Sequence, residues 1–136
     1  MALHMIKLVV GAATIEDLLD WRASHARPGE PWILRTRQTP KRGTELTDGG
    51  SVYRVFKGMI LCRQRILAVN TVGEGAAARC EVTLDEEIVR VVPAPRRAFQ
   101  GWRYLEARDA PADLRGEGVA DVPPELARRL LEAGVW

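Results

Sequence analysis

The run Arg35-Thr36-Arg37-Gln38-Thr39-Pro40-Lys41-Arg42 contains the residue types in this chain that point most directly to chemistry. Lysine and arginine neutralise phosphate groups, and the planar guanidinium of arginine binds oxygens in pairs. In an extended strand, Arg35 and Arg37 lie on the same face. The run therefore predicts either a phosphate-binding surface or a solvated edge strand that its charges protect against aggregation.

A second basic stretch, Arg96-Arg97-Ala98-Phe99-Gln100-Gly101-Trp102-Arg103-Tyr104, carries aromatic residues among its arginines. Aromatic rings beside cations are what stacking on unpaired bases requires. The alternative is a strand whose Phe99 and Trp102 fill the core while its arginines face water. Under either interpretation, Arg103 and Arg63 belong to separate strands from which both could reach one groove.

Patterns for catalysis and metal binding are scarce. Lys41 and Glu45 are four residues apart and would meet on one helical turn, which makes them the candidate acid–base pair, although a surface ion pair has the same spacing. The sequence has no phosphate-binding loop, Rossmann fingerprint or nucleophile elbow. His4 and His25 do not share a common metal-ligand spacing with the two cysteines. We therefore predict no metal site and no cofactor.

Composition favours one globular domain over residues 1–136. The hydrophobic share of 46% and the charged share of 28% are ordinary, and no apolar run is long enough to span a bilayer. The N-terminal residues lack a signal-peptide cleavage site, and two cysteines, Cys62 and Cys80, are too few for a secreted disulfide scaffold. We expect a soluble cytoplasmic protein with reduced thiols and no membrane partner.

Charge is distributed unevenly, although the net charge is only +2. Residues 35–65 contain eight basic and two acidic side chains, whereas residues 105–136 contain four basic and seven acidic ones. A basic middle and an acidic tail result, and the basic block favours a polyanionic partner such as RNA.

The elements that must position these side chains are predicted from periodicity and turn residues. Residues 3–10 read as a strand, and Thr14 with Asp17 caps a helix that runs to about Ser24. Further strands are expected at 32–39, 51–60 with a bulge at Gly58, 61–72, 79–84, 88–92 and 99–105, with one helical turn at 41–47. A surface loop at 109–123 precedes a short C-terminal helix that begins at Pro123-Pro124. The order predicts an α+β fold: a curved, mostly antiparallel sheet or a partly closed β-barrel.

Several motifs carry a resemblance to other proteins: Leu3-His4-Met5-Ile6-Lys7-Leu8, Pro40-Lys41-Arg42, Gly49-Gly50-Ser51-Val52-Tyr53, Lys57-Gly58, Arg63-Gln64-Arg65-Ile66 and Phe99-Gln100-Gly101-Trp102-Arg103-Tyr104-Leu105. In these motifs the chain resembles an uncharacterised bacterial domain-of-unknown-function family. The order of elements is also similar to the PUA-like superfamily, which includes the ASCH and EVE domains. That similarity implies a small pseudo-barrel that binds RNA or modified bases in a basic cleft, and Lys41 and Glu45 loosely resemble the ASCH motif.

Three functions are compatible with these patterns. The leading hypothesis is an RNA- or nucleotide-binding module in which Trp102 or Tyr53 stacks on a base. The second is a small hydrolase or base-modifying enzyme of ASCH type that uses Lys41 and Glu45. The third is a protein-interaction domain that docks a partner through its acidic tail or Trp136. For the leading hypothesis we expect the basic residues Arg35, Arg37, Lys41, Arg42 and Arg63 to gather on one face. We expect Arg103 to contact the nucleic acid as well.

Overall fold

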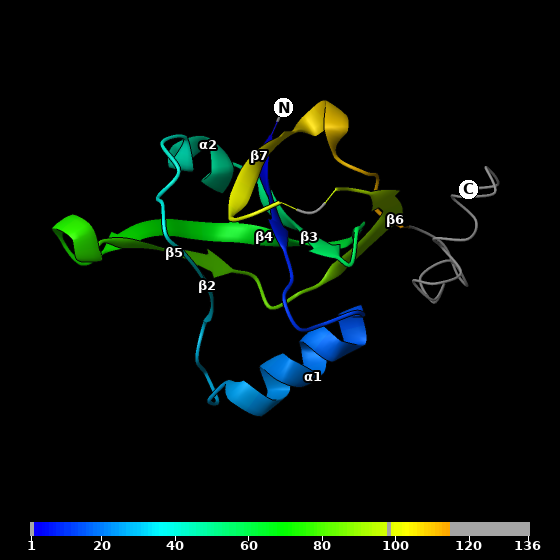
Figure 1. Cartoon of the computed structure of the whole chain (residues 1–136), viewed down its shortest axis with the longest axis horizontal. Coiled ribbons are helices and arrows are strands. Elements are labelled where there is room, and N and C mark those ends of the chain that lie inside the picture. Colours follow the sequence, from blue (N-terminus) through cyan, green and yellow to red (C-terminus); the bar gives the residue numbers. More distant parts are fainter. Residues whose placement is uncertain (1, 98, 115–136) are drawn as a thin grey trace.

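Seven strands and two helices make up the part of the chain that the structure, a computed structural model, describes: residues 2–97 and 99–114 (Figure 1). The predicted C-terminal helix, the end of the predicted surface loop and Trp136 lie outside these residues. The elements in chain order are β1 (Leu3–Leu8), α1 (Ile15–His25), β2 (Trp32–Thr36), α2 (Gly43–Thr47), β3 (Ser51–Phe56), β4 (Met59–Val72), β5 (Arg79–Leu84), β6 (Val89–Pro95) and β7 (Trp102–Glu106), with 3-10 turns at Gly75–Ala77 and Ala107–Asp109.

The strands form one mixed sheet that is not closed into a barrel. Six of the strands follow one another in the order β2-β5-β4-β3-β1-β7. Strand β6 also pairs with β4 but is not part of this linear order. Only β1 and β3 run parallel among the described pairs. Strand β4 pairs with β3 and β6 through its first half and with β5 through its second half. The register of these pairings shifts at β-bulges, and such bulges bend the strand. The predicted α+β class with a curved, mostly antiparallel sheet is confirmed.

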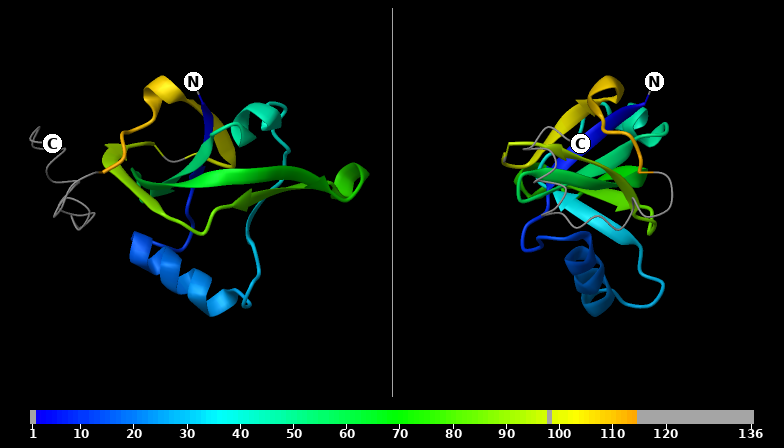
Figure 2. Two further views of the ribbon diagram at one scale, coloured as in Figure 1. Left: turned by 180° about the vertical axis from the view of Figure 1, so that it is seen from behind. Right: turned by 90° about the vertical axis from the view of Figure 1, so that its right-hand side faces the viewer.

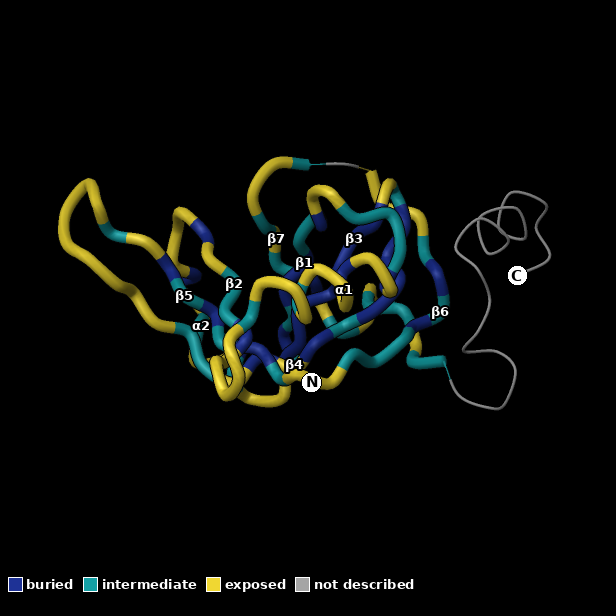
Figure 3. Tube along the Cα trace, turned by 90° about the horizontal axis from the view of Figure 1, so that it is seen from below, coloured by how far each residue is buried: buried dark blue, intermediate teal, exposed yellow. Residues whose placement is uncertain are grey.

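Hydrophobic side chains pack on both faces of β1 and β3, because successive residues of a strand point to opposite faces. Met5 and Val52 belong to the larger cluster, which also contains Leu18 of α1, whereas Ile6 and Tyr53 belong to a second cluster. Figure 3 shows that burial is concentrated in the centre of the sheet and that the end of the β4–β5 hairpin is exposed.

Helix α1 lies on one side of the sheet, and α2 lies on the other (Figures 1 and 2). The helix begins where the sequence predicts, because a capping box fixes its first turn. The Thr14 hydroxyl accepts a hydrogen bond from the Asp17 backbone N–H at 3.0 Å, and the Asp17 carboxylate accepts one from the Thr14 backbone N–H at 3.2 Å.

Several predicted strands differ in their bounds from those observed, among them the strands predicted at 51–60 and 88–92. The predicted bulge at Gly58 is wrong: Lys57 and Gly58 have φ angles of 45° and 87° and form the two-residue turn between β3 and β4. Positive φ at both central residues is the geometry that matches the twist of a tight hairpin. Strand β6 continues through Pro93 to Pro95. Among the strands it pairs with β4, and its other edge meets an isolated bridge at Val91–Asp113, before the prolines, so the prolines lie where an edge strand tolerates them.

Candidate nucleic-acid interface

A groove is lined from both β2 and β7, the two ends of the strand order, and we call it the β2–β7 groove. Its volume is about 440 Å³, and the described residues that line it include no acidic side chain. The indole N–H of Trp102 donates a hydrogen bond to the Gln38 carbonyl at 3.1 Å, so a side chain connects β7 to the segment that follows β2. The lining residues are Lys7, Arg35, Thr36, Arg37, Gln38, Gln100, Gly101, Trp102 and Arg103.

The arginines of this groove are weakly neutralised. Arg35 contacts Glu81 at 3.2 Å, but 69% of its side chain is exposed to solvent. Arg37 is exposed and makes no hydrogen bond or ion pair within the described part of the chain. Arg103 donates to two backbone carbonyls and lies 5.5 Å from the centre of the Phe99 ring. Among the described residues, Glu81 is the one carboxylate that forms an ion pair with any of these three arginines, which leaves positive charge available for an anionic ligand.

Trp102 is held rigidly at the groove wall. Besides its hydrogen bond to Gln38, its ring meets Tyr104 edge-on, with 4.9 Å between the ring centres and an angle of 77°. It also packs, partly buried, against the larger hydrophobic cluster. Its position combines the two interpretations of the sequence, because the ring supports the core and also borders the groove.

Arg42 and Arg63 do not line this groove. The Arg42 guanidinium binds both carboxylate oxygens of Glu45, at 2.5 and 2.9 Å, and lies over the Tyr104 ring. Arg63 binds both oxygens of the Asp113 carboxylate at 2.8 Å and lines a separate hollow with Asp85 and Glu87. Of the predicted phosphate-binding residues, the structure thus brings together Arg35, Arg37 and Arg103, with Trp102, and not the full set expected on one face.

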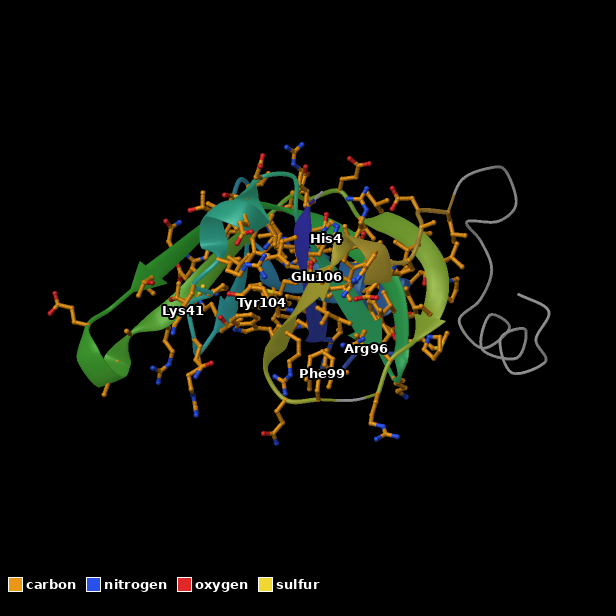
Figure 4. The ribbon with its side chains drawn as sticks, turned by 90° about the horizontal axis from the view of Figure 1, so that it is seen from above. His4, Lys41, Arg96, Phe99, Tyr104 and Glu106 are labelled. Carbon is orange, nitrogen blue, oxygen red and sulfur yellow. The ribbon has the colours of Figure 1, made fainter. Side chains whose placement is uncertain are left out.

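Lys41 and Glu45 do not share a helical turn, so the predicted pairing is wrong. Helix α2 begins at Gly43, and Lys41 precedes it. The Glu45 carboxylate instead binds Arg42, whose hydrogen bond lowers the pKa of Glu45. An exposed carboxylate with a lowered pKa is a poor general acid. In the view of Figure 4, Lys41 and Phe99 lie on opposite sides of Tyr104.

Comparison with known proteins identifies the family. The family described as a protein of unknown function, DUF1489, matches residues 5–136. The chain belongs to this family. No curated protein and no solved structure matches the sequence. The predicted resemblance to an uncharacterised domain family is confirmed, and the similarity to PUA-like proteins stays a prediction.

Two cations of this DUF1489 domain, Lys7 and Arg54, were not among the predicted binding residues. They are partners in the parallel register of β1 and β3, and Lys7 lines the β2–β7 groove. Burial and the neighbouring Arg54 lower the pKa of Lys7. The signal was present in the sequence, since Arg54 is a charged residue within the otherwise apolar run Val52-Tyr53-Arg54-Val55-Phe56.

A polar cluster around His4 was also missed. The His4 Nδ1 atom accepts a hydrogen bond from the Ser51 backbone N–H at 3.0 Å, and burial together with Arg63 lowers the pKa of His4. The Ser51 hydroxyl accepts from Arg63 at 3.0 Å, and no hydrogen bond joins it to His4. Among the described residues, the Ser51 hydroxyl is therefore engaged by Arg63, and His4 binds the Ser51 backbone instead of its hydroxyl.

The cysteines lie on β4 and β5, as the strand prediction requires. Both Cys62 and Cys80 are free and buried, and burial raises the pKa of the Cys62 thiol to about 12. Within residues 2–97 and 99–114, no three His, Cys, Asp or Glu side chains are grouped so that they could hold a metal ion. No helix in the same residues is long and apolar enough to cross a membrane.

Proposed function

We propose that this domain binds single-stranded RNA, or a nucleotide, in the β2–β7 groove. The observation that carries the proposal is a concave surface lined by Lys7, Arg35, Arg37 and Arg103, with no acidic residue among the described lining residues. The net charge of the chain is only +2, so this local concentration of cations is not a reflection of overall basicity. Such grooves attract the phosphate backbone through charge and counterion release.

The aromatic wall of the groove favours a single strand over a duplex. Proteins that bind single strands combine a basic groove with aromatic rings on which bases stack. Trp102 is already fixed by its bond to Gln38 and its contact with Tyr104, so binding would cost little side-chain entropy there. In this proposal the arginines contact phosphates and Trp102 supports one base.

The element order supports the finer proposal that the domain is PUA-like. A helix follows the first strand, and the strongly bent β4 curves the sheet. The two buried free thiols agree with a function in the reducing cytoplasm. We therefore propose that the domain is PUA-like and acts in the cytoplasm.

The proposal predicts that groove arginines, and not other exposed arginines, determine affinity for RNA. Arg37→Ala with Arg103→Ala should weaken binding of a fluorescent single-stranded RNA, measured by anisotropy at low salt, by about tenfold or more, because two charge-assisted phosphate contacts are lost. The matched control is Arg27→Ala with Arg65→Ala, which removes the same charge from two exposed residues outside the groove.

Equal losses in the two double variants would show that the charge of the whole molecule, and not the groove, binds RNA. If the wild-type protein has no measurable affinity for single-stranded RNA or for a nucleotide at low salt, the proposed function is wrong.

A further inference from the structure

A second hollow, which we call the α1 pocket, lies where α1 approaches β1, β2 and β3. Its volume is about 350 Å³, within the range typical of small-molecule sites. Most of its wall is apolar, and Lys7 and Arg54 are its two cationic residues. The other lining residues are Leu8, Val9, Val10, Gly11, Ala12, Leu18, Trp21 and Leu34.

Arg54 is buried, and no described carboxylate forms an ion pair with it. Only 5% of the residue is exposed, and its Nη1 atom donates a hydrogen bond to the Gln64 Oε1 atom at 3.0 Å. Its Nε atom is buried and has no hydrogen-bond partner among the described residues. Lys7 is its neighbour on the adjacent strand, and neither side chain makes an ion pair within the described part of the chain.

Folding alone does not account for this arrangement. A buried charge without a counterion costs free energy, and an apolar side chain of similar volume would fill the same place with less penalty. The flanking residues Val52, Tyr53, Val55 and Phe56 are all buried, so the position belongs to the core of β3. An anion that entered the pocket would neutralise two adjacent cations, Arg54 and Lys7, at once.

We propose that the α1 pocket binds a small organic anion. Arg54 and Lys7 hold its carboxylate or phosphate group, and its apolar body lies against Leu18, Leu34 and Trp21. Trp21 is 52% exposed, so it stands at the entrance of the pocket. This proposal does not rest on RNA binding, because Arg54 does not line the β2–β7 groove, although Lys7 borders both sites.

The test uses benzoate and phenyl phosphate as the two anionic probes, with benzamide as the neutral analogue of the same shape. Binding to the whole protein is followed by two-dimensional amide NMR, which locates shift changes at Lys7, Trp21 and Arg54. At least one anion should bind about tenfold or more tightly than benzamide, since a hydrogen bond to a charged group is worth that factor. The two probes distinguish a carboxylate ligand from a phosphate ligand.

Variants assign the effect to the two cations. Arg54→Met and, separately, Lys7→Met should each lower the affinity for the better anion about tenfold. Lys7 is only partly buried, so its variant keeps the test valid if Arg54→Met fails to fold. Arg96→Met is the matched control, because Arg96 is exposed and outside the pocket. Arg54→Met should leave the affinity for single-stranded RNA unchanged, which separates this site from the proposed RNA groove.

Three results would overturn the proposal. The first is that neither anion binds more tightly than about 10 mM. The second is that benzamide binds as well as the anions. The third is that Arg96→Met weakens binding as much as Lys7→Met does.

Discussion

Arg54 gives a stability prediction that can be checked without any ligand. Its guanidinium is buried with one hydrogen bond to Gln64 and no counterion among the described residues. Replacing even a buried ion pair by apolar side chains of similar volume is often neutral or stabilising by about 1–4 kcal/mol, and a buried charge without a partner costs more than a paired one. Arg54→Met should therefore raise the free energy of unfolding, measured by urea denaturation, even though Gln64 loses its donor. The exposed control Arg96→Met should stay within about 0.5 kcal/mol. A destabilised Arg54→Met protein would mean that Arg54 is a structural residue.

His4 gives a prediction about pH. Burial and Arg63 lower the pKa of His4 from its usual 6.5, so the folded protein keeps the imidazole neutral where the unfolded chain is already protonated. The unfolded state binds more protons in that window, so stability is full above about pH 6.5 and is lost as pH falls through the lowered pKa. His4→Asn keeps an acceptor for the Ser51 N–H but cannot titrate.

Urea denaturation at pH 7.5 and pH 5 should show a smaller loss of stability for His4→Asn than for the wild type. A pH dependence that is identical in the two proteins would contradict the role assigned to His4.

At the residue scale, the sequence identified side chains but not their neighbours. Arg35, Arg37, Trp102 and Arg103 were predicted as binding residues from local composition, and they share one groove. Arg54 and Lys7 become neighbours only through the parallel register of β1 and β3, whose residues are more than 40 positions apart. Local patterns carry no information about such a register, so the pairing of Lys7 with Arg54 was missed.

At the element scale, Gly50 joins α2 to the start of β3. A Cβ atom at this position would lie 2.3 Å from the carbonyl oxygens of both Leu3 and Leu46. Gly50→Ala should lower the free energy of unfolding by about 1–3 kcal/mol, because two backbone segments would have to move. Gly43→Ala is the control, since its Cβ would meet only Val69 at 3.5 Å, an ordinary contact. Thermal denaturation distinguishes them, and equal melting temperatures would show that the junction adapts without cost.

The start of α1, which has a clear capping sequence, was predicted well, whereas the turn between β3 and β4, which lacks the usual turn residues, was not. The Thr14–Asp17 capping box fixes the start of α1 within one turn of sequence. The β3–β4 turn has Lys57 at positive φ, where asparagine, aspartate or glycine is the usual signal. The sequence therefore favoured one long strand across Gly58. The late start of α2 likewise separated Lys41 from Glu45.

At the scale of the whole molecule, function depends on where the cations lie and not on their number. Arginines outside the groove are engaged by carboxylates, as the exposed Arg42 is by Glu45 and the partly buried Arg63 is by Asp113. These pairs cancel charge over much of the surface. The β2–β7 groove is the described surface on which Lys7, Arg35, Arg37 and Arg103 gather beside an aromatic ring. Binding that uses this groove must weaken steeply as salt screens its charges.

The salt dependence of RNA affinity tests this account most directly. Log affinity for a single-stranded RNA should fall linearly with log salt, and each lost phosphate contact should flatten the slope by about 0.7. Arg37→Ala with Arg103→Ala should therefore flatten it by about 1.4 relative to the wild type, while Arg27→Ala with Arg65→Ala should leave it unchanged. A groove variant that keeps the wild-type slope would contradict the claim that the β2–β7 groove binds the phosphate backbone.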